Sequence, residues 1–499
     1  MPAAATAAPS PAPAAAGVRA DFNGDGWADL AVGVPYEDVG SAGSAGAVNV
    51  IYGSALGLKR NGNQLLHEGL LAGAAEANDR FGSALAAGDF NGDGRTDLAI
   101  GVAGENVSGH TEAGAVSIVY GSAAGLKTTG DQLWDQSQLS GALEAGDRFG
   151  STLAAADLNG DGRTDLAVGV QEDLETAGTT AEAAGAINVI YGSATGLSAA
   201  GNQLWHQGRL AGAVEAADGF GDALAAGDLN GDRRADLIVG VPQEDVDGIN
   251  EAGAVNVIYG SPTGLATAGN QLWTQRELAG TAEAGDRFGA AVTAGDFNGD
   301  GSADLVAGVQ YEDVGSTSDA GAVNVIYGSS AGLRAAGNQL WDQDSLHGAA
   351  FAANQFGAAV ATGDFNADGR ADLAVGVPNE SVYGFNAAGA VNVIHGSSAG
   401  LLAGGDQVWH QGSLSGNPED FDQFGAAVAT GDFNGDGRAD LAVGVDREDV
   451  DDNEDVGVVN AVYGNGFGLA RDGNQVWDQN ALTGAGEPND SFGHTLAAG

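Results

Sequence analysis

The chain has 499 residues, no cysteine and a formal net charge of -49, from 18 basic and 67 acidic residues. The absence of cysteine excludes disulfides, cysteine–zinc sites and thiol catalysis. The charge argues against binding to nucleic acid, which depends on lysine and arginine, and against binding to anionic membrane surfaces. No apolar stretch reaches about 18 residues, so we expect no membrane insertion.

Residues 1–20 form an Ala/Pro-rich tract that contains four of the ten prolines. The tract lacks the basic start and the leucine-rich centre of a complete signal peptide. We interpret it as a flexible linker. The alternative is that it is the remnant of a signal peptide whose start lies upstream.

From residue 21 onward, one sequence period recurs seven times. Each copy contains the segment Asp-Phe/Leu-Asn-Gly/Ala-Asp, and successive copies begin 68 or 71 residues apart. A Phe-Gly pair also occurs seven times, and in the last six copies it stands eight residues before the first aspartate. Such regularity indicates a fold in which one unit is repeated around or along an axis. The acidic segments begin at Asp21, Asp89, Asp157, Asp228, Asp296, Asp364 and Asp432.

One period has the pattern of four short β-strands. In the second copy these strands are predicted at 81–87, 98–102, 115–120 and 132–134, and the acidic segment separates the first two. The inner strands are nearly continuous apolar runs, which suit sheets that are covered on both faces. Seven periods of four strands predict an all-β fold, a seven-bladed β-propeller that spans residues 21–499.

The two ends of the repeat region complement each other. The region begins directly at an acidic segment, without the Phe-Gly strand before it, and residues 491–499 supply such a strand at the other end. We therefore expect this C-terminal strand to pair with the N-terminal blade, which closes the ring and removes two exposed sheet edges. The alternative is a fragment in which another aspartate would have followed.

The first acidic segment has the pattern of a calcium loop. Asp21, Asn23, Asp25 and Asp29 occupy positions 1, 3, 5 and 9, and Gly26 at position 6 permits a bend with positive φ. Calcium prefers six to eight oxygen ligands. Alternate residues of a tight loop converge, so we expect positions 1, 3 and 5, the backbone carbonyl of position 7 and the aspartate at position 9 to surround one ion. Position 12 lacks the glutamate of an EF-hand, so the segment is a hairpin loop.

The same oxygen pattern recurs in all seven segments, which argues against ordinary turns. We therefore predict up to seven calcium sites. The expected ligands, with position 7 acting through its carbonyl, are Asp21, Asn23, Asp25, Trp27, Asp29, Asp89, Asn91, Asp93, Arg95, Asp97, Asp157, Asn159, Asp161, Arg163, Asp165, Asp228, Asn230, Asp232, Arg234, Asp236, Asp296, Asn298, Asp300, Ser302, Asp304, Asp364, Asn366, Asp368, Arg370, Asp372, Asp432, Asn434, Asp436, Arg438 and Asp440.

Two segments depart from this pattern. Arg233 stands at position 6 of the fourth segment, where a left-handed conformation costs about 1–2 kcal/mol for a residue other than glycine. We therefore expect the fourth site to bind calcium most weakly. Ala367 replaces glycine at position 4 of the sixth segment, and we expect it to be tolerated because this position coordinates nothing.

The Phe-Gly pair, the acidic segment and the following Gly33-Val34-Pro35 together resemble the FG-GAP repeat, which builds the N-terminal propeller of integrin α chains and occurs in many secreted bacterial proteins. The resemblance covers about residues 21–499. It implies calcium on the face formed by the loops between the first and second strands, and a ligand on the opposite face. It also implies export and an adhesion-type role. The chain differs from integrins in that all seven loops are acidic.

Two further features each allow two interpretations. Tryptophan, or leucine in the first copy, occupies one repeat position; it either stacks on sugars or packs between blades, and the single leucine favours packing. A Glu-Asp pair recurs in the loop between the second and third strands, where the third copy is three residues longer; it is either simply solvated or part of a binding face. The residues at the repeat position of the tryptophans are Leu66, Trp134, Trp205, Trp273, Trp341, Trp409 and Trp477. The pairs are Glu37-Asp38, Glu172-Asp173, Glu244-Asp245, Glu312-Asp313 and Glu448-Asp449.

The sequence offers no catalytic constellation. Residues 328–332 and 396–400 match the G-x-S-x-G pattern of a nucleophile elbow, but equivalent segments lack the central serine and no helix is predicted after them. We therefore predict a monomeric, non-catalytic calcium-binding scaffold, secreted or at the cell surface. It would bind an extracellular protein or glycan on the face opposite the calcium loops, and no nucleic acid. The alternative is a lectin-like propeller, which exposed tryptophans between the blades would support.

Overall fold

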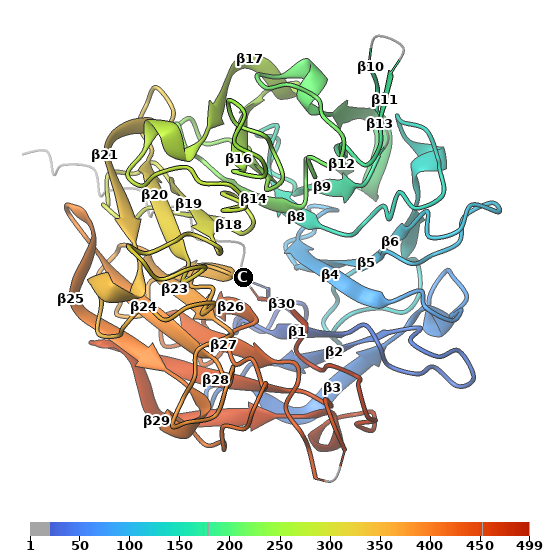
Figure 1. The fold of residues 1–499 in the computed structure, drawn as a ribbon. Coiled ribbons are helices and arrows are strands. Elements are labelled where there is room, and N and C mark those ends of the chain that lie inside the picture. Colours follow the sequence, from blue (N-terminus) through green and yellow to red (C-terminus); the bar gives the residue numbers. More distant parts are fainter. Residues whose placement is uncertain (1–19, 173, 177–178, 452, 499) are drawn as a thin grey trace, which may run out of the picture.

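The computed structural model describes residues 20–172, 174–176, 179–451 and 453–498, so the expected linker lies outside the described part except for its last residue. In this part of the chain, seven four-stranded antiparallel sheets stand around a central axis as the blades of a propeller (Figure 1). We number the blades 1 to 7 by the acidic segment that each contains. The predicted all-β fold and the number of blades are confirmed.

Each blade is a meander of four strands, from an inner strand at the axis to an outer strand at the rim. The inner strands of blades 1 to 7 are β30 (Thr495–Ala497), β4 (Phe81–Gly88), β8 (Leu153–Ala156), β14 (Ala223–Gly227), β18 (Val292–Gly295), β22 (Ala359–Gly363) and β26 (Ala427–Gly431). The second strands are β1 (Leu30–Val34), β5 (Asp97–Val102), β9 (Asp165–Val170), β15 (Asp236–Val241), β19 (Asp304–Val309), β23 (Asp372–Val377) and β27 (Asp440–Val445).

The outer half of each blade follows the same order. The third strands are β2 (Ala47–Tyr52), β6 (Ala115–Val119), β12 (Ala186–Ser193), β16 (Ala254–Ser261), β20 (Ala322–Tyr327), β24 (Ala390–Ser397) and β28 (Val458–Asn465). The outer strands are β3 (Lys59–Leu66), β7 (Gln132–Trp134), β13 (Gly196–Trp205), β17 (Gly264–Trp273), β21 (Arg334–Trp341), β25 (Gly400–Trp409) and β29 (Gly468–Trp477). One 3₁₀ turn follows each outer strand, as η1 (Glu68–Leu70), η2 (Gln136–Gln138), η3 (Gln207–Arg209), η4 (Gln275–Glu277), η5 (Gln343–Ser345), η6 (Gln411–Ser413) and η7 (Gln479–Ala481).

The longer loop of the third copy forms an additional hairpin. Its two strands, β10 (Leu174–Thr176) and β11 (Thr179–Ala181), pair only with each other among the described strands. Figure 1 shows the hairpin projecting from the ring near β13. The insertion thus extends one connecting loop and leaves the four strands of blade 3 in place.

The hydrophobic core is divided among the contacts between neighbouring blades. All residues of the second strands are buried, because the adjacent blades cover both faces of each sheet. The described residues form seven hydrophobic clusters, one at each blade interface. The cluster between blades 7 and 1, for example, joins Leu30 and Val32 to Phe433, Trp477 and Phe492. The nearly continuous apolar strands of the sequence are explained by this two-sided burial.

The Phe-Gly pair provides one packing residue and one close approach in every blade. The phenylalanines are at most 1% exposed. Gly82, which follows Phe81, has a φ of +93°, and a Cβ atom at this residue would lie 2.8 Å from the carbonyl oxygen of Ala47. Glycine is therefore required for both its conformation and its small size.

The repeated tryptophans pack between the blades. Five of the six are 4–8% exposed, and Leu66 at the equivalent position in blade 1 is 1% exposed. Trp205 contacts a core cluster that includes Val239 and Val241 of the next blade. The packing interpretation is confirmed for these five tryptophans, and Trp341, which is partly buried, also packs against a core cluster.

The ring closes as predicted. β30 pairs with β1 in antiparallel register, with Ala497 opposite Ala31 and Thr495 opposite Gly33. The hydroxyl of Thr495 also donates to the carbonyl oxygen of Gly82 in blade 2, at 2.7 Å. The first blade therefore combines three strands from the N-terminal part of the chain with one strand from the C-terminal part.

Candidate calcium loops and the face opposite them

The seven acidic segments lie on one face of the propeller, where each inner strand leads to the second strand; we call it the loop face. In loop 1, both carboxylate oxygens of Asp21 accept backbone hydrogen bonds, from Asp25 N at 3.0 Å and from Gly26 N at 2.8 Å. The side-chain oxygen of Asn23 also accepts from Asp25 N, at 2.8 Å. These contacts hold the predicted ligands of positions 1, 3 and 5 in one tight turn.

The aspartate at position 9 is more deeply buried than its neighbours. Asp29 is 0% exposed, and its two oxygens accept hydrogen bonds from Phe22 N and Gly53 N, both at 2.9 Å. Burial raises the pKa of Asp29 to about 8, and the nearby carboxylates of Asp21 and Asp25 raise it further, against the two backbone hydrogen bonds. The same two backbone hydrogen bonds recur in the other six blades. This aspartate therefore ties the loop to the turn after the third strand, a role that the sequence did not reveal.

The backbone conformation explains the glycine at position 6 and the two departures from the pattern. Gly26 has a φ of +92°, and Arg233 at the equivalent position has a φ of +71°, so the arginine adopts the left-handed conformation expected of it. Ala367 at position 4 has a φ of +58°, where Gly24 in loop 1 has +72°. The alanine therefore also occupies a left-handed conformation that favours glycine. The expectation that Ala367 is tolerated considered only its lack of ligand atoms and not this backbone strain.

In several loops the arginine side chain at position 7 forms an ion pair with the carboxylate of position 5, in addition to the expected role of the position 7 carbonyl. A guanidinium nitrogen of Arg234 lies 2.8 Å from a carboxylate oxygen of Asp232, and the same pair in loop 7, Arg438 and Asp436, is 3.2 Å apart. In loop 1, where position 7 is Trp27, Lys59 lies 3.4 Å from Asp25. Exposed ion pairs of this kind are worth little stability. They place a positive group against the carboxylate of position 5 that a cation would also use.

Neighbouring loops are joined by a ring of backbone hydrogen bonds. In each described loop the N–H of position 8 donates to the carbonyl oxygen of position 1 in the preceding blade, at 2.8–3.2 Å. The last of these bonds, from Ala28 to Asp432, closes the ring across the seam between blades 1 and 7. The donors are Ala28, Thr96, Thr164, Ala235, Ala303, Ala371 and Ala439. Each loop is thus positioned by its neighbour as well as by its own turn.

The donor set of the loops fits a hard cation. Positions 1, 3, 5 and 9 offer carboxylate or amide oxygens in all seven copies, and calcium binds such oxygens. Within the described residues, the one group of three acidic side chains whose oxygens all lie within 4.8 Å of one another is elsewhere, at Glu68, Asp79 and Glu105. In the described loops, by contrast, no three acidic side chains bring their oxygens this close together, so the convergence of positions 1, 5 and 9 on one ion stays a prediction.

The opposite face carries the loops between the second and third strands and the connections between blades. The glutamates of the repeated Glu-Asp pairs are mostly buried here, and each accepts a hydrogen bond from a glutamine of the preceding blade. Gln136 Nε2, for example, donates to Glu172 Oε2 at 2.9 Å. Burial raises the pKa of Glu172 to about 7. The solvated interpretation is wrong for these glutamates, because their side chains join neighbouring blades. The interpretation of the loop as part of a binding face stays a prediction.

The opposite face also carries exposed aromatic side chains that are not repeated. Tyr383, Phe385 and Phe421, which we call the blade 6 aromatic group, are 74%, 40% and 58% exposed. Phe421 N donates to Asn386 O at 2.8 Å, which places Phe421 beside the loop that carries the other two. The equivalents of Tyr383 and Phe385 in blade 1 are Gly40 and Ala42. The group is thus confined to one blade.

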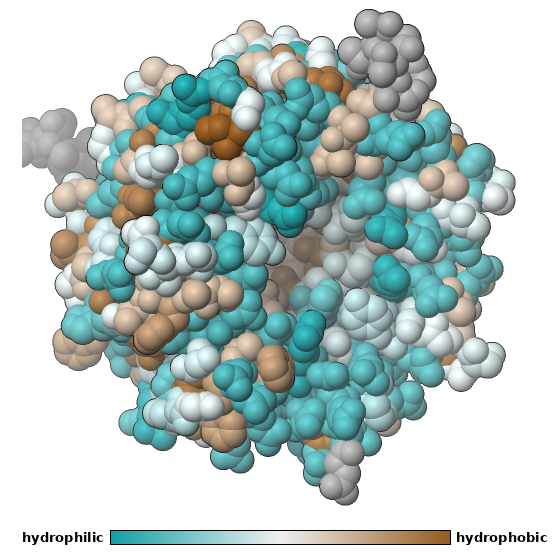
Figure 2. Space-filling view, in the orientation of Figure 1, coloured by the Kyte–Doolittle hydropathy of each residue, from teal (hydrophilic) through white to brown (hydrophobic). Residues whose placement is uncertain are grey.

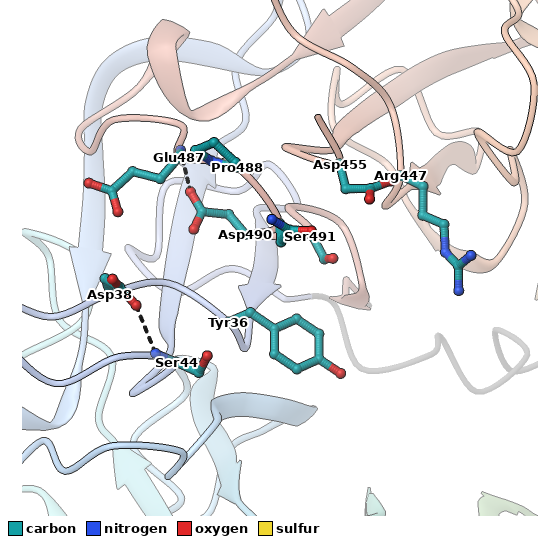
Figure 3. A pocket seen from close by; sticks show the side chains of 10 residues that line it. Tyr36, Asp38, Ser44, Arg447, Asp455, Glu487, Pro488, Asp490 and Ser491 are labelled. Carbon is teal, nitrogen blue, oxygen red and sulfur yellow. Dashed lines mark hydrogen bonds between the residues drawn. The ribbon is translucent and has the colours of Figure 1, made fainter. Parts of the chain in front are cut away.

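The described part of the molecule contains hollows in two places that bear on binding. One, with a volume of about 720 Å³, lies between blades 7 and 1 and is lined by acidic side chains such as Asp38, Asp455 and Glu487, together with Tyr36 and Arg447 (Figure 3). The other, of about 320 Å³, lies at the axis and is lined by small and apolar residues of the inner strands. Figure 2 shows a depression at the centre of a mostly hydrophilic face.

No helix in the described part of the chain is long and apolar enough to cross a bilayer. Curated proteins of two kinds are among those similar to the chain. It is 38% identical over 152 residues to phosphatidylinositol-glycan-specific phospholipase D of Mus musculus, a match that covers 30% of this chain and 17% of that enzyme. It is 33% identical over 249 residues to integrin alpha pat-2 of Caenorhabditis briggsae, covering 46% of this chain and 18% of the integrin. The chain therefore matches less than a fifth of either relative.

Among solved structures, exotype rhamnogalacturonan lyase YesX can be superposed on 89% of this chain, and the match covers 60% of the lyase chain. The sequence identity is 12% and the TM-score is 0.36, which is too low to carry an argument. The FG-GAP repeat model matches seven segments, which together cover more than half of the chain. They are residues 12–51, 81–119, 149–187, 220–258, 288–326, 356–394 and 424–463. With a Phe-Gly strand and an acidic loop in every blade, the chain belongs to the FG-GAP repeat family.

Proposed function

We propose that this chain is a calcium-stabilised, non-catalytic binding module that acts outside the cell or at its surface. It would bind calcium at the loop face and a protein or glycan at the opposite face. The observation that carries the proposal is the contrast between the two faces: the loops repeat the same oxygen-bearing residues, whereas exposed aromatic side chains on the opposite face are not repeated and are most numerous at blade 6.

The electrostatics of the loops support the calcium component. Each loop contains three carboxylates, at positions 1, 5 and 9, and the buried aspartate at position 9 has a raised pKa in most blades. Such a group is costly to ionise without a counter-charge. A divalent ion would supply that charge, and the chain as a whole carries a formal net charge of -49 for it to offset.

The blade 6 aromatic group supports the binding component. Large aromatic side chains are enriched at the centres of binding surfaces, and an exposed group of them on a soluble fold marks an interaction site. The rings of Tyr383 and His410 pack edge to face, with centroids 5.1 Å apart, so part of the surface is already ordered. The burial of the repeated tryptophans removes the stacking platforms on which the lectin-like alternative depended. We therefore favour a protein ligand.

The similarity to integrin α chains supports an adhesion-type role and an extracellular location. The similarity to a phospholipase D covers 17% of that enzyme, so its activity is not transferred to this chain. The sequence pattern offers no catalytic constellation, which supports a non-catalytic role.

A paired comparison of surface variants tests the proposal. Tyr383→Ser combined with Phe421→Ser removes most of the blade 6 aromatic group, and Leu56→Ser combined with Phe467→Ser removes two side chains that are 90% and 89% exposed in turns on the loop face. We expect wild type and the second variant to bind the same targets on arrays of extracellular proteins and glycans in calcium, and the first variant to lose binding at least tenfold. Equal losses in both variants, or binding by neither them nor wild type, would contradict the proposal.

A further inference from the structure

Six blade interfaces share one buried hydrogen bond on the face opposite the loops. The first residue of each 3₁₀ turn from η2 to η7 is glutamine, and its side-chain amide donates to a glutamate of the following blade at 2.5–2.9 Å. The six pairs are Gln136–Glu172, Gln207–Glu244, Gln275–Glu312, Gln343–Glu380, Gln411–Glu448 and Gln479–Glu37. A neutral donor thus compensates a buried carboxylate at each of these interfaces.

The interface between blades 1 and 2 lacks this donor. The first residue of η1 is Glu68, and its partner Glu105 in blade 2 occupies the position of the other glutamates. Asp79, in the connection between the blades, completes the group, and the three side chains each offer an oxygen within 4.8 Å of the other two. The change from glutamine to glutamate therefore replaces a hydrogen-bonded pair with three converging carboxyl groups.

Most oxygens of the three carboxyl groups have no hydrogen-bond donor, and one oxygen of Asp79 accepts from Glu76 N. Glu68 is 1% exposed and Asp79 is 0% exposed. Both oxygens of Glu68, one oxygen of Asp79 and one oxygen of Glu105 are buried without a hydrogen-bond donor. Burial raises the pKa of Glu68 to about 9, and the neighbouring carboxylates of Glu105 and Asp79 raise it further. Unpaired buried carboxylates cost several kcal/mol unless a cation or a shared proton compensates them.

We propose that Glu68, Asp79 and Glu105 form a further cation site, which binds a hard divalent ion such as calcium and lies apart from the seven loops. The ligands are all carboxylate oxygens, which suits calcium rather than zinc, since zinc favours histidine and cysteine. Glu105 is only partly buried, so it leaves a path from solvent to the two buried carboxylates. The ion fixes blade 1 to blade 2, where the other interfaces use a hydrogen bond.

The proposal does not depend on the loops, because its variants leave all seven of them intact. Glu68→Gln installs the residue that six interfaces already contain, so the variant is expected to fold. Gln207→Glu creates the reverse change, since its neighbours Glu244 and Asp218 occupy the positions of Glu105 and Asp79 and are 5% and 1% exposed. Native mass spectrometry of the full chain in calcium counts the bound ions of each variant directly.

We expect Glu68→Gln to bind one calcium ion fewer than wild type and Gln207→Glu to bind one more. In EDTA, Glu68→Gln should melt at a higher temperature than wild type, because glutamine supplies a donor to Glu105. Saturating calcium should narrow or reverse that difference. An unchanged ion count in Glu68→Gln, with a melting difference that does not depend on calcium, would show that the cluster holds only a proton and would overturn the proposal.

Discussion

The two faces of the propeller differ in how strictly they keep the repeat. On the loop face, the same oxygen-bearing residues occupy positions 1, 3, 5 and 9 of every loop, and one backbone hydrogen bond links each loop to the next. On the opposite face, equivalent positions hold Gly40 in blade 1 and Tyr383 in blade 6, and blade 3 carries an additional hairpin. The difference indicates that the loop face maintains the ring, whereas the opposite face can vary without changing the fold. Substitutions on the two faces should therefore have different kinds of effect.

Removal of calcium should have the largest effect, and it should act through the loop face. A ligand at 100 times its dissociation constant contributes about 2.7 kcal/mol per site to stability. With several sites on one ring, EDTA should lower the melting temperature by tens of degrees, as followed by circular dichroism, and calcium should restore it. Magnesium at the same concentration is the control, because it accepts irregular oxygen cages less readily. A melting temperature that EDTA leaves unchanged would contradict calcium binding by the loops.

Damage to the seam should be the next largest effect. Phe492→Ala removes a side chain that is 0% exposed between blades 7 and 1, and such a truncation typically costs about 3–5 kcal/mol. Phe467→Ala is the control, because Phe467 is 89% exposed and its loss should change stability by less than about 0.5 kcal/mol. Urea denaturation at fixed calcium measures both. Equal stability of the two variants would mean that β30 does not close the ring.

The opposite face should make stability depend on pH. Burial raises the pKa of Glu244 from 4.5 to about 7, opposed by the hydrogen bond from Gln207 and increased by Asp218, Glu215 and Asp245. A carboxyl group with a raised pKa in the folded state contributes stability below its unfolded value, and this contribution is lost as the pH rises through its folded value. Between pH 5 and 8, wild type should therefore lose stability that Glu244→Gln keeps, on the order of 1–3 kcal/mol.

Chemical denaturation of the two proteins at several pH values and constant calcium measures this difference. The variant keeps an acceptor oxygen for Gln207 Nε2, which lies 2.5 Å from Glu244 in wild type, so the hydrogen bond itself is conserved. Parallel pH profiles for wild type and variant would show that Glu244 stays ionised throughout.

The smallest effect should come from the strained position in loop 4. Arg233 has a φ of +71° and an exposed side chain, so Arg233→Gly should relieve about 1–2 kcal/mol of backbone strain without removing a contact in the core. We expect the fourth site to bind calcium about 5- to 30-fold more tightly as a result. Titration calorimetry of wild type should show one weak class of site that disappears in the variant. Seven equivalent sites in wild type would contradict this account.

Most of the fold could be predicted from the sequence, because the repeat displays each element seven times. The strand predicted at 98–102 is β5, one residue longer at its start, and the strand predicted at 132–134 is β7. The pairing of β30 with β1 followed from the complementary ends of the repeat region. Local patterns of glycine, aspartate and apolar residues determine these strands and loops. Because the patterns recur in every copy, the prediction for one copy supports the prediction for the others.

Contacts between blades could not be predicted in the same way. Glu68 differs visibly from the glutamine of six other copies, but the sequence does not tell that its partner Glu105 lies in the next blade. The buried glutamates lie in segments with the composition of polar loops, and their glutamine donors lie 36 or more residues away. The positive φ of Ala367 is a property of the backbone, which the pattern of ligand residues in the loop does not indicate. The role of a side chain that contacts another blade can be assigned only when the structure shows which residues the blades bring together.

The seam has a mechanical consequence. Residue 20 precedes loop 1 and residue 498 follows β30, so both described ends of the chain leave blade 1 on the loop face. Tension applied between these two ends would peel β30 from β1 one residue pair at a time, starting with Ala497 and Ala31. The strands would not be loaded in shear, in which all pairs break together. Loop 1 lies at the start of this path, since Asp29 N donates to Ala20 O at 2.6 Å. An ion bound in loop 1 would therefore resist the separation of β30 from β1, and the force needed to open the ring should rise with the calcium concentration.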